Sequence, residues 1–195
     1  EEPKALELGL AWCKKTDADL LLATDPDCDR VGVAAKKNGV LEQLSGNQVG
    51  VLLLDYILKS RQEAGTLPEN PVVIKTIVTT SMADRIAEHY GAEVIDTLTG
   101  FKYIGEQVGA LEKNKEADRF VFGFEESCGY LIGSYVRDKD AVGAAMVICE
   151  MADVYKSQGK TLWDVLEELY ETYGHYETTL KNYEFQGADA RKRMD

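Results

Sequence analysis

Apolar residues in the first part of the chain change from a helical spacing to short strand-like runs. Residues 5–15 carry them at helical intervals, which predicts a helix. Residues 20–24, 31–35 and 40–44 are short and rich in Leu, Val and Ala, so each predicts a strand. The Asn-Gly pair at 38–39 is a strong signal for a hairpin turn between the last two strands. The first unit is therefore a helix followed by three short strands.

From residue 46 onward, helical and strand-like patterns alternate. The predicted helices lie at about 47–63, 81–90 and 101–113, and the predicted strands at about 72–78, 92–96 and 119–124. This alternation predicts an α/β fold in which helices cover a parallel sheet. The change of pattern places a domain boundary near residue 44.

Two more helices are predicted beyond this series, at about 138–157 and 161–173. The second has an apolar stripe along one side, which we expect to lie in the core rather than against a cofactor. Residues 175–185 alternate like an extended strand, and we expect them to lead into a further domain.

Composition narrows the class of protein. The 195 residues suffice for one full domain and part of another, and the 45% hydrophobic content supports a core. A net charge of −12 argues against a nucleic-acid surface, which would require a basic stripe. No apolar run approaches the roughly 20 residues that cross a bilayer, so we expect no membrane partner. The chain starts at Glu1 and stops in what looks like an unfinished helix, so we expect it to be a fragment.

The four cysteines are scattered and form no Cys-X-X-Cys pair. We expect them to be reduced thiols, as in a cytoplasmic protein.

Residues 25–30, with the sequence Asp-Pro-Asp-Cys-Asp-Arg, carry the strongest chemical signal. Three carboxylates on alternate residues repel one another, and a bound divalent cation would relieve that cost. Oxygen ligands favour Mg²⁺, Mn²⁺ or Ca²⁺ over zinc. Asp25, Asp27 and Asp29 are thus candidate metal ligands, and Arg30 could hold a phosphate. The alternative is a polar hairpin turn, for which Asp and Pro are ordinary residues.

The sequence can be compared with the pattern of a calcium-binding EF-hand loop. An EF-hand needs Gly at its sixth position and Glu at its twelfth, where this chain has Arg30 and Lys36. Mg²⁺ fits better, because it takes a few protein carboxylates and completes its shell with water and a phosphate oxygen.

Ligands of open α/β sheets gather at the carboxyl ends of the strands. After the strand at 92–96, Thr99, Gly100 and Lys102 precede or open a helix, where Gly permits close backbone approach and the helix start favours an anion. By itself this evidence is weak, because Thr-Gly before a helix is also a plain capping arrangement.

After the strand at 119–124, the loop at 125–129 carries Glu125, Glu126 and Ser127. These groups suit sugar hydroxyls, although a solvated loop is the alternative. Adjacent carboxylates repel, so we expect the two to point in opposite directions with only one in the site. Glycoside hydrolysis also uses paired carboxylates, but neighbours in sequence give no defined separation across a glycosidic bond.

Residues 137–140, Arg-Asp-Lys-Asp, stand before the apolar helix predicted at 138–157. Asp138 or Asp140 could cap that helix, whereas Arg137 and Lys139 make better sense there if an anion docks beside them. His89 and His175 have no partner that would give them a catalytic context, so we expect both to be structural.

Together the loops at 25–30, 99–102 and 123–129 resemble those of the α-D-phosphohexomutases, the phosphoglucomutase and phosphomannomutase family. The first is similar to the family's Mg²⁺ loop, usually Asp-Gly-Asp-Gly-Asp-Arg, with different spacers. The second resembles the substrate loop of the third domain and the third its sugar-specificity loop. Residues 137–140 are similar to a following segment whose Lys, here Lys139, lies in the active site.

The resemblance implies a mixed, mostly parallel sheet with helices on both faces, plus a partial second α/β unit. It divides the chain into the end of domain 2 (residues 1–43), domain 3 (44–174) and the start of domain 4 (175–195). The catalytic serine loop of domain 1 and the phosphate loop of domain 4 are expected in the remaining domains of a longer parent chain, so we expect this fragment to be inactive alone.

The implied reaction interconverts glucose 1-phosphate and glucose 6-phosphate through a phosphoserine and a bisphosphate, with Mg²⁺ held by Asp25, Asp27 and Asp29. Glu125 and Ser127 are expected to hold the hexose phosphate hydroxyls. The residues expected near phosphate or reacting oxygens are Arg30, Lys102 and Lys139, of which Arg30 and Lys139 are the candidate catalytic residues, while Lys139, Thr99 and Gly100 also bind substrate.

Substrate choice stays open at this point. The Glu-Glu-Ser form favours glucose, and Tyr130 stands where phosphomannomutase-like members often have His. Phosphomannomutase and phosphopentomutase activity are the alternatives within the enzyme class. A non-catalytic sugar-phosphate-binding domain is the alternative from another class.

Overall fold

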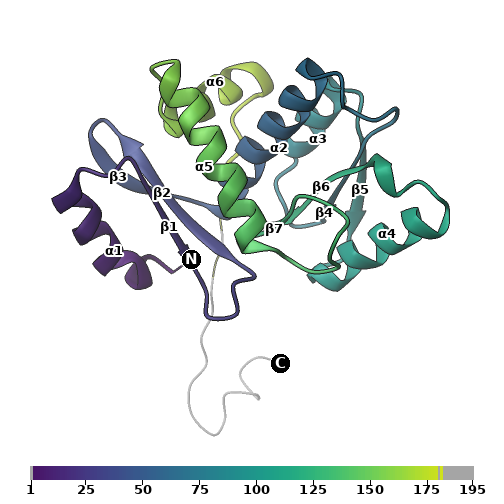
Figure 1. Cartoon of the computed structure of the whole chain (residues 1–195), viewed down its shortest axis with the longest axis horizontal. Coiled ribbons are helices and arrows are strands. Elements are labelled where there is room, and N and C mark those ends of the chain that lie inside the picture. Colours follow the sequence, from purple (N-terminus) through teal and green to yellow (C-terminus); the bar gives the residue numbers. More distant parts are fainter. Residues whose placement is uncertain (1, 180, 182–195) are drawn as a thin grey trace, which may run out of the picture.

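The structure is a computed structural model that describes residues 2–179 and 181. A three-stranded antiparallel sheet opens the chain (Figure 1). Its strands, in the order β1-β2-β3, are β1 (Leu20–Thr24), β2 (Val31–Lys37) and β3 (Val40–Leu44). The hairpin between β2 and β3 turns at Asn38 and Gly39, whose φ angles are 51° and 83°. Helix α1 (Pro3–Thr16) packs on β1 and β3.

A second sheet contains four strands in the order β5-β4-β6-β7. The strands are β4 (Val72–Thr76), β5 (Glu93–Thr97), β6 (Phe120–Glu125) and β7 (Gly129–Leu131). Strand β4 runs parallel to β5 and β6, and β7 returns antiparallel to β6. The sheet is therefore mixed and mostly parallel, as predicted.

Helices cover both faces of this second sheet. They are α2 (Gly46–Glu63), α3 (Met82–His89), α4 (Phe101–Lys113), α5 (Ala141–Ser157) and α6 (Leu162–Tyr173), with a 3-10 turn at Ala117–Arg119. Alternation along β4 separates the faces: Val72 and Ile74 pack with α4, whereas Val73 packs with the cluster that contains α2 and α3. The predicted α/β class, with helices on both faces, is confirmed.

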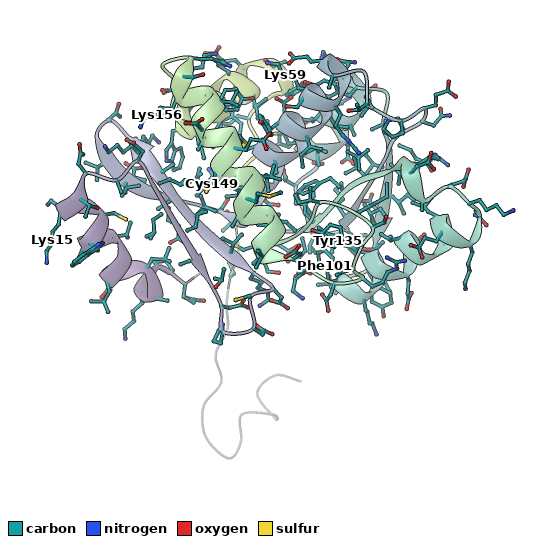
Figure 2. All side chains as sticks on the ribbon, viewed as in Figure 1. Lys15, Lys59, Phe101, Tyr135, Cys149 and Lys156 are labelled. Carbon is teal, nitrogen blue, oxygen red and sulfur yellow. The ribbon has the colours of Figure 1, made fainter. Side chains whose placement is uncertain are left out.

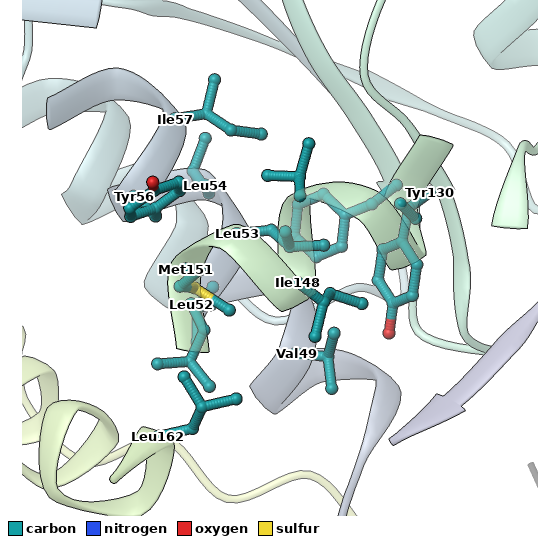
Figure 3. Packing of buried hydrophobic residues seen from close by; sticks show 14 of the residues in the cluster. Val49, Leu52, Leu53, Leu54, Tyr56, Ile57, Tyr130, Ile148, Met151 and Leu162 are labelled. Carbon is teal, nitrogen blue, oxygen red and sulfur yellow. The ribbon is translucent and has the colours of Figure 1, made fainter. Parts of the chain in front are cut away.

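The larger hydrophobic cluster joins the two sheets. It includes Val33 and Leu44 of the first sheet together with Phe122 of the second. Helix α5 lies between the sheets and contacts strands of both, whereas α6 contacts β2 of the first sheet. The indole N–H of Trp163 on α6 donates a hydrogen bond to the carbonyl of Ala35 on β2 at 3.2 Å. Figure 3 shows α5 side chains such as Ile148 packed against residues of α2 inside this cluster. The predicted domain bounds remain a prediction.

The structure corrects three predicted elements. The strand predicted at 72–78 ends at Thr76, and Ile77 and Val78 lie in a turn with 59% and 48% of their surfaces exposed. The helix predicted from 138 begins at Ala141, since Asp140 accepts hydrogen bonds from the first turn as its cap. No strand forms at 175–179 or 181, the described part of the extended segment predicted at 175–185; its other residues lie outside the described part.

The three-residue strand β7 was not predicted, because it is too short to show an alternating pattern. Within residues 2–179 and 181, no helix has the length and apolar character that crossing a bilayer requires.

Candidate active site

The turn between β1 and β2, which we call the acidic turn (residues 25–30), contains the three acidic residues expected to bind metal. One carboxylate oxygen from each of Asp25, Asp27 and Asp29 lies within 4.8 Å of the others. Opposite ligands in an octahedral Mg²⁺ shell lie about 4.2 Å apart, so this donor set fits a hard cation after small side-chain movements. Only oxygen donors meet in this cluster, which favours Mg²⁺ over a soft metal.

Backbone hydrogen bonds pre-shape this loop. Oδ1 of Asp25 accepts the N–H groups of Asp29 at 3.1 Å and Arg30 at 3.0 Å. Burial raises the pKa of Asp25, but these hydrogen bonds outweigh it and the net shift is downward. The loop therefore holds Asp25 ionised, the form that a cation needs.

The second part of the site is the loop between β6 and β7, which we call the glutamate loop (residues 125–129). Glu125 is only 4% exposed. Burial raises the pKa of its carboxyl group, although a hydrogen bond with Ser127 and the charges of Lys139 and Arg30 act in the opposite direction. Glu125 and Ser127 are thus in contact. The two side chains therefore lie close enough to bind neighbouring hydroxyls of one sugar.

The acidic turn and the glutamate loop lie directly against each other. Arg30 forms a β-bridge with Gly129, and the N–H of Val31 donates to the carbonyl of Cys128 at 3.2 Å. A charge contact adds to this backbone pairing, since Nη2 of Arg30 lies 3.9 Å from Oε1 of Glu125. The candidate metal ligands and the candidate sugar-binding glutamate therefore lie in two loops that contact each other.

Lys139 connects the start of α5 to the same place. Its Nζ lies 2.9 Å from Oδ2 of Asp29 and 3.0 Å from Oδ1 of Asp138, and 5.4 Å from the centre of the Phe101 ring. Burial lowers the pKa of Lys139, but the hydrogen bonds with the two carboxylates reverse this and raise it. Lys139 is therefore a fixed positive charge beside the acidic turn.

The third predicted loop opens α4. Gly100 has a φ of 120°, a conformation that suits Gly. Phe101, labelled in Figure 2, opens α4, and its ring lies near Nζ of Lys139. Thr99 and Lys102 are exposed, and Nζ of Lys102 lies 4.6 Å from the ring of Tyr103 rather than against the acidic turn. The structure thus brings the helix start to the site but leaves these two side chains at its border.

Two residues of the 137–140 segment do not face the acidic turn. Arg137 pairs with Glu112 of α4. Asp140 caps α5 by accepting the N–H groups of Val142 and Gly143, both at 3.0 Å. The anion-docking role considered for this segment therefore has Lys139 as its candidate, not Arg137.

Sequence reasoning missed Thr76 and Thr79, which contact the glutamate loop through Glu126. Their hydroxyls lie 3.1 Å and 3.3 Å from Oε2 of Glu126. The available signal was their position at the end of β4, where Thr76 is the last strand residue and Thr79 follows, at the same carboxyl edge as the other loops.

Tyr130 is fully buried, and its hydroxyl donates to the carbonyl of Gly46 at 3.0 Å. In this structure it forms part of the core beneath the glutamate loop. The two histidines pack against aromatic rings, His89 beside Tyr90 and His175 beside Tyr170.

Comparison with known proteins gives consistent similarities. Residues 45–173 match the family model "Phosphoglucomutase/phosphomannomutase, alpha/beta/alpha domain III". The whole chain is 35% identical to a phosphoglucomutase of Staphylococcus aureus (strain MRSA252), of which it spans 34%.

Solved structures agree with this. One from Thermus thermophilus, assigned as a phosphomannomutase, is 28% identical with a TM-score of 0.68 over 89% of this chain and 35% of that one. An N-acetylphosphoglucosamine mutase of Aspergillus fumigatus, solved with GlcNAc-6P and magnesium, shares the fold at 16% identity and a TM-score of 0.54, over 80% of this chain and 33% of that one.

Proposed function

Because this chain belongs to the phosphoglucomutase/phosphomannomutase family, we propose that its parent protein is a phosphoglucomutase. The proposed reaction interconverts glucose 1-phosphate and glucose 6-phosphate through a phosphoserine and a bisphosphate intermediate. The chain spans about a third of the length of the curated relatives it matches, so the activity belongs to the parent and the chain alone is proposed to be inactive. The remaining domains of the parent are its proposed partners.

The observation that carries the proposal is the meeting of the acidic turn with the glutamate loop. The ion pairs of Arg30 with Glu125 and of Lys139 with Asp29 support it, because they join the proposed metal ligands, two positive groups and the proposed sugar-binding carboxylate. Phosphoryl transfer between sugar oxygens needs this combination, because catalysis depends on positioning and on charge stabilisation.

Asp25, Asp27 and Asp29 are the proposed ligands of Mg²⁺, the metal present in the Aspergillus fumigatus structure. When bound, Mg²⁺ would offset the negative charge that builds up on the phosphoryl group. The aspartates fit this role because their oxygens already lie close together and Asp25 is held ionised.

The other residues bind and orient the hexose phosphate. Glu125 and Ser127 would hold sugar hydroxyls, which the contact between them supports. Arg30 and Lys139 would face phosphate oxygens as catalytic residues, since both lie beside the acidic turn.

At the other border of the site, the start of α4 at Thr99 and Gly100 would offer backbone N–H groups to an anion. Lys102, exposed on the first turn of the same helix, would add a positive charge there. The four cysteines, all within the described residues, are not joined by disulfides, which fits a proposed location in the reducing cytoplasm.

Glucose is the proposed sugar because relatives that match over the whole chain include phosphoglucomutases of Staphylococcus aureus. The similarity to the Thermus thermophilus structure makes phosphomannomutase the second candidate. Comparing kcat/KM of the full-length parent for glucose, mannose and ribose 1-phosphates separates these and the pentose alternative. A preference for mannose or ribose would overturn the proposed substrate.

The metal assignment is tested by Asp27→Asn in the full-length parent. We expect activity to fall about 100-fold or more, because charge stabilisation by a bound cation contributes several kcal/mol. Calorimetric titration with Mn²⁺ should show weakened binding, while circular dichroism should be unchanged because Asp27 is exposed.

Asp118→Asn, at an exposed carboxylate of the 3-10 turn, is the control and should leave both activity and metal binding unaltered. Normal Mg²⁺-dependent rates in Asp27→Asn would remove the metal assignment. A full-length parent that binds sugar phosphates without converting them would instead favour a non-catalytic binding domain.

A further inference from the structure

Glu126 follows Glu125 directly, but its side chain points to a different part of the molecule. Oε2 of Glu126 lies 3.1 Å from the hydroxyl of Thr76 and 3.3 Å from that of Thr79. Glu125 instead faces Arg30 and Lys139. The two side chains therefore point in different directions. The Glu125 carboxylate faces the candidate site, and the Glu126 carboxylate faces the end of β4.

The threonines that hold Glu126 are themselves fixed. Thr76 is 0% exposed and Thr79 is 4% exposed, and their hydroxyl oxygens lie 2.8 Å apart. A backbone hydrogen bond from the N–H of Thr79 to the carbonyl of Thr76 closes the turn. Two hydroxyl protons serve three contacts, so one threonine can donate to Glu126 while the other donates either to Glu126 or to its neighbour. Hydrogen bonds to a carboxylate are the stronger kind, which favours Glu126 as acceptor.

The loop has little space in which to shift. A Cβ added at Gly46, at the start of α2, would lie 2.0 Å from the carbonyl oxygen of Glu126. On the other side, a Cβ at Gly129 would lie 2.4 Å from Cδ of Lys139 and 2.9 Å from Oε1 of Glu125. A loop packed this closely transmits a change at Glu126 to Glu125, because the backbone between them cannot absorb it.

We propose that Glu126 is a positioning residue, held by the Thr76 and Thr79 hydroxyls, that sets the orientation of Glu125 and Ser127 toward the sugar and so contributes to the choice between hexose phosphates. This inference rests on the proposed mutase function. Glu126 acts through the loop and touches no substrate, because its carboxylate is directed at β4.

The test uses the full-length parent with Glu126→Gln, Thr79→Val and Thr79→Ser. Glu126→Gln removes the charge at constant shape, and we expect KM for glucose 1-phosphate to rise about tenfold, the effect of losing a charge-assisted hydrogen bond. The change in kcat should be smaller, and the preference for glucose over mannose 1-phosphate should shrink. The Mg²⁺ concentration for half-maximal activity should not move, since the acidic turn is untouched.

Thr79→Val should reproduce the higher KM, whereas Thr79→Ser keeps the hydroxyl and should remain close to wild type. The double variant Glu126→Gln with Thr79→Val should be no worse than Glu126→Gln alone, because both changes break one contact. Glu171→Gln, at an exposed carboxylate of α6, is the matched control. Should Glu126→Gln lower the folded fraction, the Thr79 pair carries the same test.

Three outcomes would overturn the inference. Variants of an active parent with unchanged KM and sugar preference would show that Glu126 does not position the loop. A strong effect of Glu126→Gln together with a wild-type Thr79→Val would show that the Thr79 hydroxyl does not hold Glu126. A wild-type parent without mutase activity on any of the three sugar phosphates would instead overturn the proposed function, and this inference with it.

Discussion

Two adjacent glutamates show how strongly one position along the chain changes the surroundings of a carboxyl group. Glu125 is buried beside Arg30, and burial raises its pKa. Glu126 is partly exposed and accepts hydrogen bonds from threonine hydroxyls. The surroundings of each glutamate therefore depend on the element that its side chain contacts, and not on its position in the sequence.

Asp55 on α2 is a buried carboxyl group outside the site. It is 7% exposed, and the hydroxyl of Tyr90 donates to its Oδ1 at 3.0 Å. Burial raises the pKa of Asp55, although the Tyr90 hydrogen bond and the charges of Lys59 and His89 oppose this shift. The folded protein thus binds this proton more tightly than the unfolded chain, so the contribution of Asp55 to stability falls as pH rises from 3.8, the unshifted pKa, through the raised folded value.

Asp55→Asn should therefore raise the melting temperature by a few degrees near about pH 7, where wild-type Asp55 carries its unfavourable buried charge. The gain should shrink near about pH 4, because more of the wild-type carboxyl group is then protonated in the folded state than at the higher pH. Asn keeps an acceptor for Tyr90. Thermal unfolding of both proteins at the two pH values checks this, with exposed Asp118→Asn as control. A gain that is equal or larger at the lower pH would contradict the assigned pKa direction.

At the scale of elements, the start of α2 supports the glutamate loop. Ser45 accepts a hydrogen bond from the N–H of Gln48, and the Gln48 side chain accepts one from the N–H of Ser45, which completes a capping box. This cap fixes where the helix begins, and Gly46 follows immediately beneath the loop. The capped start of α2 thus packs directly against the backbone of the glutamate loop.

Gly46→Ala should destabilise the protein by about 1 to 3 kcal/mol, because the added methyl group would overlap the carbonyl of Glu126. The control is Gly109→Ala in α4, where the nearest atom to an added Cβ is Nε of Arg137 at 4.0 Å. That variant should be neutral or slightly stabilising, since Ala is the better helix former. Denaturant unfolding measures both changes. Equal effects of the two substitutions would contradict the close approach of α2 to the loop.

At the scale of the whole molecule, the two sheets share one hydrophobic cluster. Val33 and Leu44 of the first sheet lie in the same cluster as Phe122 and Leu166. Helix α5 lies between the two sheets (Figure 1), and α6 packs against β2 of the first sheet and against helices α2, α3 and α5. The acidic turn and the glutamate loop belong to different sheets, so this shared core determines how closely they meet.

Leu44→Ala should cost about 3 kcal/mol, since Leu44 is 1% exposed and its removal leaves a cavity in the shared cluster. The loss should appear equally in slow hydrogen exchange of β2 and β4 amides, because one cooperative core gives one global unfolding reaction. Val40→Ala, at a 64% exposed position of the same strand, should change little. Loss of protection confined to the first sheet would show that the two sheets unfold independently.

The sequence alone determined most of the elements, because the spacing of apolar residues is a local property. The strands at 20–24 and 40–44 and the helix at 101–113 lie where the pattern predicted them. The order of acids in the turn at 25–30 also indicated a cation, since a tight turn can bring carboxylates on alternate residues close together. The signal failed where it was short or misleading: β7 has three residues, and Ile77 and Val78 are apolar but exposed.

Only the tertiary structure decided which side chains meet. No local pattern indicates that Lys139 reaches Asp29, that Arg137 turns to Glu112, or that Glu126 binds threonines at the end of β4. These contacts join residues far apart in sequence, and they depend on how strands pair and on how helix α5 packs against two sheets at once. Such packing depends on the whole core, so these contacts cannot be predicted from the sequence around each of the two residues.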